Sequence, residues 1–314
     1  MKKTLIALSA ALALALAQAQ ETPVTIAISG WTGFAPLTLA KEAGLFKKQG
    51  LDVTIKKIPQ KDRHLAIASG DVQCAATTVE TWIGWNAAGV TTTQIFQLDK
   101  SYGADGMVVR PGITRISDLK GKTVAASPPG TSPYFALAWM LKKNGMSVKD
   151  VKVVNLEPQP AANATIAGTE GIDAGMTYEP YLSAVRAKPE AGKIIATTLD
   201  YPMVMDTFGC TPKFLAENPK AARGLANAYF DAVDMIKADP KKSFEIMGAD
   251  VKQSAEAFEG SQKYLRWQDR AANQKFFSGE HAAFSKEAAD LLLEAGIIKT
   301  IPDLSKLADT QFIK

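Results

Sequence analysis

Apolar and polar positions along residues 24–99 follow a repeating order of strand-like and helix-like segments. VTIAISG (24–30) and LDVTIKKIP (51–59) are typical of strands, whereas APLTLAKEAGLFKKQG (35–50) has apolar residues at helical spacing. The order continues with KDRHLAIASG as a short helix, DVQCAATT as a strand, VETWIGWNAAG as a helix and TTQIFQLD as a strand. This alternation predicts an α/β fold, with a mostly parallel sheet flanked by helices.

A second run of the same kind follows Pro111-Gly112 and ends near residue 199. From about Gly209 the pattern becomes helical, with predicted helices over 212–238, 240–248, 251–259 and 281–296. Because these helices need a sheet face to cover, we expect the chain to return to its first half. We therefore predict lobe 1 over 20–109 plus 207–314 and lobe 2 over 110–206, with connections crossing near 107–112 and 200–208.

The first residues predict export. The chain opens MKKTLIALSAALALALAQAQ: two lysines, an apolar run of about fifteen residues and the small-residue site Ala17-Gln18-Ala19. This pattern is typical of a secretory signal peptide over residues 1–19, with a mature protein that begins near Gln20 in the periplasm. The run is short for a membrane span, and no cysteine follows the cleavage site to carry a lipid.

Charge and reactive residues exclude several classes of function. The net charge is +4, and the lysines are spread along the chain without a basic run, so we expect no nucleic-acid partner. His64 and His281 have no suitably spaced metal-ligating neighbours, and the sequence lacks GxSxG, HExxH, Walker A and GxGxxG motifs. We expect no catalytic residue, metal or cofactor. Cys74 and Cys210 could pair in an oxidising compartment or stay as buried thiols.

Polar and aromatic side chains follow the ends of the predicted strands. In open α/β sheets, ligands bind beyond the carboxyl ends of the strands, which here would face a cleft between the lobes. In lobe 1 the candidate ligand-binding residues are Trp31, Thr32, Phe34, Thr77, Thr78, Glu80, Asp99 and Asp105. In lobe 2 and near the second crossing they are Gly130, Thr131, Ser132, Tyr178, Glu179 and Asp206.

Each of these residues also has a purely structural interpretation. The loop SPPGTSP runs into a helix, and Ser, Thr and Gly are common at helix starts because they satisfy free backbone N–H groups. Glu80 and Glu179 would complement helix dipoles, and an Asx-turn would account for one of the aspartates near Tyr102. The sequence leaves both interpretations open.

Four segments in order resemble a known family over nearly the whole mature chain. They are LAKEAGLFKKQGLDV, IASGDVQCAATTVE, DLKGKTVAASPPGTSPYFAL and GTEGIDAGMTYEPYLS. With them the chain resembles the periplasmic solute-binding proteins of nitrate/sulfonate/taurine ABC importers and their NMT1-like, thiamine-precursor-binding relatives. The resemblance implies a two-lobe type II periplasmic-binding-protein fold, a venus flytrap that closes on a small solute. It also implies a partner permease in the inner membrane, and we expect a monomer.

The charge of the expected solute can be argued from the predicted cleft rim. In sulfonate and taurine binders the helix-start loop meets the anionic head group, but here Pro133 removes one N–H donor. The rim carries several carboxylates, and Arg63 is the nearest cation, so an anion would be repelled whereas a guanidinium, amine or protonated heterocycle would be attracted. We therefore expect a small nitrogenous, cationic solute.

Three alternatives stay open. An organosulfonate or similar oxyanion would fit the family if some carboxylates turned to solvent. The carboxylates would bind a hard metal ion if they converged. The same fold also serves fungal thiamine-pyrimidine synthases, although the clustered cysteines of those enzymes are missing here.

Overall fold

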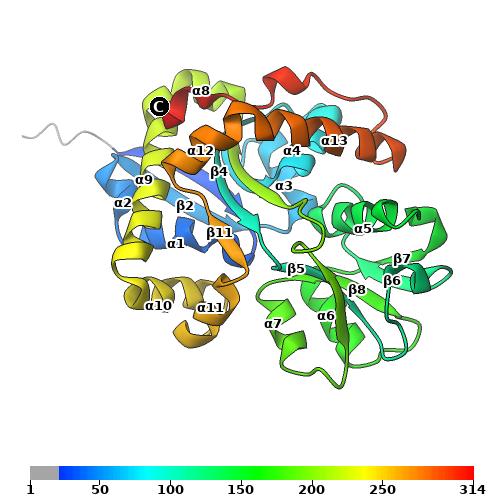
Figure 1. Ribbon diagram of the computed structural model, residues 1–314. Coiled ribbons are helices and arrows are strands. Elements are labelled where there is room, and N and C mark those ends of the chain that lie inside the picture. Colours follow the sequence, from blue (N-terminus) through cyan, green and yellow to red (C-terminus); the bar gives the residue numbers. More distant parts are fainter. Residues whose placement is uncertain (1–20) are drawn as a thin grey trace, which may run out of the picture.

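The computed structural model describes residues 21–314, and the predicted signal peptide lies outside them. Two sheets organise this part of the chain, one on each side of Figure 1. None of its helices combines the length and hydropathy needed to cross a membrane.

The larger sheet has six strands in the order β11-β4-β10-β3-β1-β2. They are β11 (Leu265–Trp267), β4 (Thr93–Ser101), β10 (Met205–Cys210), β3 (Cys74–Thr78), β1 (Thr22–Ile28) and β2 (Leu51–Lys57). Strands β2, β1 and β3 are parallel, while β10 is antiparallel to both β3 and β4. The sheet is therefore mixed, because the returning strand β10 enters it from the opposite end.

The smaller sheet has five strands in the order β7-β6-β8-β5-β9. They are β7 (Lys152–Asn155), β6 (Thr123–Ala126), β8 (Ala174–Tyr178), β5 (Asp105–Val109) and β9 (Lys193–Thr197). The turn 102–104 therefore makes the first crossing between the sheets, earlier than the expected 107–112. The apolar run of β5 suits either sheet, so its local pattern did not reveal which one it joins. We call residues 22–101 and 205–314 the first half, and 105–197 the second half.

Helices cover both sheets, as the α/β pattern predicts. Those of the first half are α1 (Ala35–Glu42), α2 (Leu45–Lys48), α3 (Gln60–Ala68), α4 (Val79–Ala87), α8 (Pro212–Glu217), α9 (Pro219–Ala238), α10 (Pro240–Asp250), α11 (Ala255–Gln262), α12 (Arg270–Lys275) and α13 (His281–Glu294). Those of the second half are α5 (Ser132–Lys143), α6 (Pro158–Ile166) and α7 (Tyr181–Arg186). In α9, Leu225, Tyr229 and Val233 recur at a spacing of four and bury one face in the core of the first half.

Two predicted helices are each divided in the structure. The segment 35–50 breaks after α1 because Gly44 has a φ of 71°, a left-handed conformation that ends a helix. The segment 212–238 breaks at Asn218, because Pro219 cannot continue α8 and instead begins α9. The short strand β11, which pairs with the end of β4, was not predicted from the sequence.

The two cysteines form a disulfide. Cys74 begins β3, Cys210 ends β10, and the two residues are directly opposite in this antiparallel pair. Of the two states that the sequence left open, the structure has the paired one. The bond closes a loop of 136 residues that contains the whole second half.

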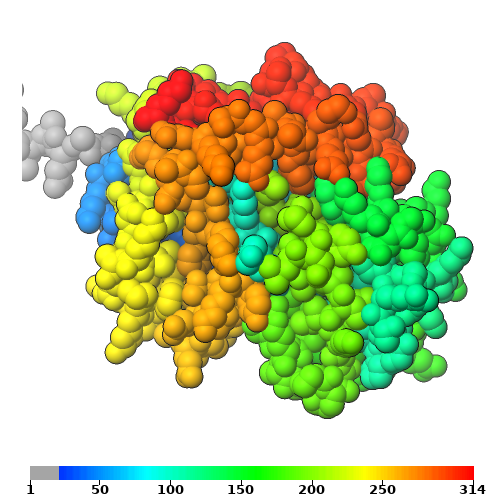
Figure 2. All heavy atoms as spheres, in the orientation of Figure 1, coloured from blue at the N-terminus to red at the C-terminus, as the bar shows by residue number. Residues whose placement is uncertain are grey.

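The halves also meet at a seam between α13 and α5, away from the crossings. The Phe284 ring lies 5.9 Å from that of Trp139, and Lys143 Nζ lies 2.9 Å from Glu287 Oε1. Figure 2 shows the orange-red α13 segment resting directly on the green surface of the second half. The two halves are thus in contact away from the crossings as well as at them.

Candidate functional site

A small cavity lies where strand ends of the two halves meet. Its volume is about 20 Å³, room for about one water molecule. It is lined by Ser29, Trp31, Phe34, Gln60, Arg63, Thr78, Asp105, Ser132, Tyr178, Val204 and Asp206. Both halves contribute, so a molecule held here would touch both at once.

The β-α order accounts for the position of these residues. Trp31 and Phe34 follow β1, and Thr78 ends β3. In the second half, Tyr178 ends β8 and Ser132 begins α5. Of the residues predicted from strand ends, the structure brings Trp31, Phe34, Thr78, Asp105, Ser132, Tyr178 and Asp206 to the cavity wall.

Four buried carboxyl groups gather beside this cavity: Glu80, Asp99, Asp105 and Asp206. Asp206 on β10 is opposite Asp99 on β4 and opposite Thr78 on β3. One oxygen each of Asp105 and Asp206 has no hydrogen-bond partner; the carboxyl groups of Glu80 and Asp99 make no hydrogen bond of good geometry, although the Thr78 and Ser132 hydroxyls lie beside Glu80 and the Trp31 indole lies beside Asp99. Buried carboxylates normally have partners, so this cluster is poised for a ligand that donates hydrogen bonds.

Burial is the main cause of the altered acidity of this cluster. It raises the pKa of Glu80 to about 8 and that of Asp105 to about 7. The pKa values of Asp99 and Asp206 are also raised well above their ordinary value, first by burial and then by the charge of a neighbouring carboxylate. A cation placed among the four groups would favour their ionised forms.

Arg63 is the buried cation closest to the cluster. Its Nε donates to Ile58 O at 2.9 Å and its Nη1 donates to Ala76 O, while Nη2 has no partner. Burial lowers the pKa of Arg63 to about 10, so the side chain keeps its charge at neutral pH. The sequence identified Arg63 only as the nearest cation, because its burial on α3 depends on how that helix packs.

Two aromatic side chains from opposite halves frame the cavity. The rings of Trp31 and Tyr178 lie 5.2 Å apart at an interplanar angle of 76°. Gly33 is required beneath Trp31, since a Cβ there would lie 2.3 Å from both Trp31 Nε1 and Asp99 Oδ2. The cavity therefore combines aromatic faces with carboxyl groups.

The remaining predicted residues lie off the cavity wall. Thr131 donates its hydroxyl to Pro128 O at 2.7 Å, and Gly130 provides a left-handed turn with a φ of 88°. Thr77 accepts a hydrogen bond from Gln60 Nε2 at 2.8 Å, and Thr32 is buried beside Trp31. These residues support the loops that carry Ser132, Thr78 and Trp31.

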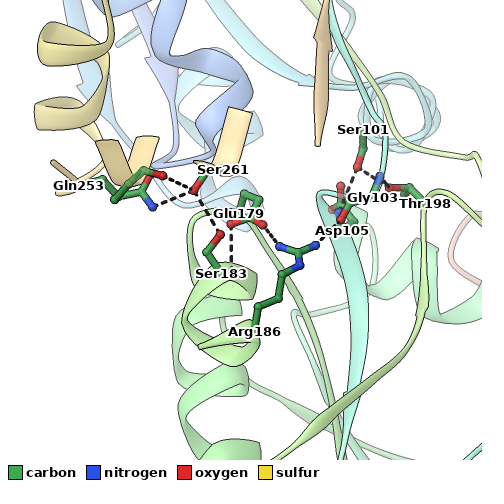
Figure 3. Close-up of polar contacts among 10 residues, drawn as sticks. Ser101, Gly103, Asp105, Glu179, Ser183, Arg186, Thr198, Gln253 and Ser261 are labelled. Atoms are coloured by element: carbon green, nitrogen blue, oxygen red, sulfur yellow. Dashed lines mark hydrogen bonds and ion pairs between the residues drawn. The ribbon is translucent and has the colours of Figure 1, made fainter. Parts of the chain in front are cut away.

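Glu179 is engaged by the protein itself (Figure 3). It forms an ion pair with Arg186 and accepts a hydrogen bond from the Ser183 backbone N–H at 3.1 Å. Arg186 also donates to Gly103 O at 2.8 Å in the first crossing, and its guanidinium carbon lies 3.7 Å from the centre of the Tyr264 ring. We therefore assign Glu179 a structural role, in place of the ligand contact expected from its position after a strand.

A larger groove of about 290 Å³ opens outward from the cavity. The two spaces share Ser29, Gln60 and Tyr178, and the groove adds Tyr181, Glu157 and several prolines. It runs between the halves, and the side chains of Gln60 and Tyr178 lie on the wall that it shares with the inner cavity. Gln60 was missed in the sequence because Pro59-Gln60 after β2 carries no distinctive signal.

Within residues 21–314, no three His, Cys, Asp or Glu side chains are arranged to hold a metal ion. Both cysteines are in the disulfide. The metal-binding alternative and the synthase alternative therefore find no supporting group of residues in this part of the chain.

Comparison with known proteins gives consistent results. Residues 31–243 match the family model described as NMT1/THI5 like. The chain is 29% identical over 245 residues to the taurine-binding periplasmic protein of Escherichia coli, covering 74% of this chain and 72% of that protein. It is 26% identical over 227 residues to the 4-amino-5-hydroxymethyl-2-methylpyrimidine phosphate synthase THI13 of Saccharomyces cerevisiae, covering 67% and 65%.

Among solved structures, the alkanesulfonate-binding protein SsuA of Xanthomonas axonopodis superposes with a TM-score of 0.80. The match has 17% sequence identity and covers 93% of this chain and 99% of that protein. At this identity the likeness concerns the fold, and it confirms the α/β periplasmic-binding-protein fold expected from the sequence.

Proposed function

The chain belongs to the NMT1/THI5-like family, and from this premise we propose that it is the periplasmic solute-binding component of an ABC importer. The fold is shared with importer binding proteins, and the sequence relatives include a taurine-binding periplasmic protein. In this proposal the predicted signal peptide directs export, and the loaded protein docks as a monomer on a permease in the inner membrane. The yeast synthase is a more distant relative, so an enzymatic function is not favoured.

We propose that the two halves act as lobes that close on the solute. The cavity has room for about one water molecule, so its walls would move apart to take a solute that contacts Trp31 and Asp206 of the first half together with Tyr178 and Asp105 of the second. Such a solute binds the closed form more strongly than the open form, which shifts the population toward closure. The dividing points are then the two crossings, at 102–104 and 198–204.

We propose a small nitrogenous cation as the solute: a guanidinium, an amine or a pyrimidine-like base. The observation that carries this choice is the cluster of buried carboxyl groups with unpartnered oxygens. A cation there gains charge-assisted hydrogen bonds and stacks on Trp31 or Tyr178. An organosulfonate would gain the free Nη2 of Arg63, but it would keep the four carboxyl groups protonated and form no ion pair with them, whereas a cation would form ion pairs as they ionise, so the organosulfonate is not favoured.

Isothermal titration calorimetry with guanidinium, a hydroxymethyl-aminopyrimidine and taurine tests this choice. We expect one of the two nitrogenous compounds to bind, and Asp105→Asn to weaken that binding by about 1–3 kcal/mol, because a charge-assisted hydrogen bond is lost. Asp231→Asn, at an exposed position of α9, is the matched control and should bind like the unaltered protein. Tight binding of taurine alone would refute the proposal.

A further inference from the structure

We propose that Gln60 sets the charge preference of the cleft by occupying the backbone donor that an oxyanion would use; this rests on the proposed binding function. The Gln60 side chain reaches from α3 of the first half to the start of α5 in the second. Its Oε1 accepts a hydrogen bond from Ser132 N at 3.1 Å. Its Nε2 donates to Thr77 Oγ1 at 2.8 Å and to Thr81 Oγ1 at 2.9 Å.

The first turn of α5 has only one other free donor. Pro133 has no N–H, the Phe135 N–H donates to Thr131 O at 3.0 Å, and the Tyr134 N–H has no acceptor among the described residues. Helix starts attract anions because their first N–H groups are free and the helix dipole is positive there. With the Ser132 N–H bonded to the Gln60 amide oxygen, one of the two backbone donors that this helix start could offer an anion is already occupied by the protein.

The surroundings of Gln60 hold several groups that would suit an oxyanion once the side chain is removed. Ser132 Oγ is buried and makes no hydrogen bond of good geometry, its polar neighbour being the Glu80 carboxyl group, and Ser132 as a whole is 5% exposed. The hydroxyls of Thr77, Thr78 and Thr81 surround the Gln60 amide, and Arg63 Nη2 is unpartnered at the same cavity. Removing the Gln60 amide would therefore expose one N–H, several hydroxyls and the edge of a guanidinium.

Gln60 also controls the space available. It lines both the inner cavity of about 20 Å³ and the outer groove of about 290 Å³. A side chain cut back to Cβ would open the inner cavity toward the groove, beside the donors just described. The Gln60 side chain therefore occupies both a hydrogen-bond donor and the space that an anion would need.

Glu80, together with Asp105 and Asp206 of the cavity wall, could oppose such an anion. Glu80 lies beside the Thr78 and Ser132 hydroxyls, and burial raises its pKa to about 8 and that of Asp105 to about 7. At pH 6 both groups are therefore mostly protonated and able to donate a hydrogen bond. An anion in the space left by Gln60 is accordingly best sought at this pH.

The test compares Gln60→Ala and Gln60→Glu in calorimetry at pH 6, with methanesulfonate as the probe. We expect Gln60→Ala to bind methanesulfonate at least about ten-fold more tightly than the unaltered protein, the worth of about one charge-assisted hydrogen bond. Gln60→Glu is the matched control: it keeps the length and the acceptor for the Ser132 N–H and adds negative charge, so it should gain nothing. Gln60→Ser is a second variant, should the alanine variant not fold.

Two results would overturn the inference: tight methanesulfonate binding by the unaltered protein, or folded Gln60→Ala and Gln60→Ser variants that bind it no better. Folding is checked by circular dichroism and thermal unfolding. Guanidinium and the aminopyrimidine, titrated in parallel into the unaltered protein, keep the two proposals separate. A gain of methanesulfonate binding without any nitrogenous ligand would support the role of Gln60 and refute the proposed solute class.

Discussion

The substitution Glu80→Gln removes one buried ionisable group from the cleft without changing its shape. In the folded protein the pKa of Glu80 is raised from 4.5 to about 8 by burial. A carboxyl group with a raised folded-state pKa keeps its proton while the unfolded chain ionises. The free energy of unfolding of the ligand-free protein therefore falls as pH rises from about 4.5 to about 8.

The magnitude follows from the same values. Each pH unit in this window lowers the free energy of unfolding by about 1.4 kcal/mol for one such group, so Glu80 contributes a loss on the order of 4 kcal/mol. Asp105, with its pKa raised to about 7, adds a loss of its own below that pH. In Glu80→Gln the first contribution disappears, and the variant should be more stable than the unaltered protein at pH 8 and similar at pH 4.5.

Urea unfolding of the ligand-free protein at several pH values between 4.5 and 8 measures this difference. Glu245→Gln, at an exposed position of α10, is the matched control and should follow the unaltered protein throughout. If Glu80→Gln keeps the same loss of stability with pH as the unaltered protein, then Glu80 ionises freely in the folded state. Burial would then not raise the pKa of Glu80 above its ordinary value.

Three further predictions concern the ligand, the disulfide and the ion pair between Glu179 and Arg186. Binding of the cationic solute should strengthen from pH 5 to pH 8 and release protons, measurable as a buffer-dependent heat, because Asp105 and Glu80 ionise around the cation; a pH-independent affinity would contradict this. Replacing Cys74 and Cys210 together by alanine should lower the free energy of unfolding by about 2–4 kcal/mol, since their bond closes a 136-residue loop, and urea unfolding that does not change on substitution would contradict it. Arg186→Leu should lower the free energy of unfolding in urea by about 3–5 kcal/mol, because it leaves Glu179 buried without its ion-pair partner. Adding Glu179→Gln to this variant should recover most of that loss, and a double variant as unstable as Arg186→Leu alone would contradict this.

The fold and much of the cavity could be predicted from the sequence because their signals are local. Strand and helix periods are visible within short segments of the sequence. The rule that ligands bind beyond strand ends pointed to Trp31, Thr78, Ser132 and Tyr178, all of which line the cavity. The role of Glu179 could not be predicted in this way. Its partner Arg186 lies one short helix later, and both the ion pair and the Tyr264 contact depend on how that helix packs.

Other features depend on tertiary arrangement alone. The sheet that β5 joins is decided by pairing with β8 and β9, which its own apolar residues do not encode. The disulfide requires a register between β3 and β10 across the entire second half. Gln60 gains its importance only because α5 of the other half begins opposite it.

Mass spectrometry of the solute that co-purifies with the protein under native conditions would show directly which class of compound the cleft binds. We predict a small basic compound, released on denaturation, whose amount falls when Asp105→Asn is purified in the same way. An organosulfonate or another oxyanion released from the unaltered protein would contradict it.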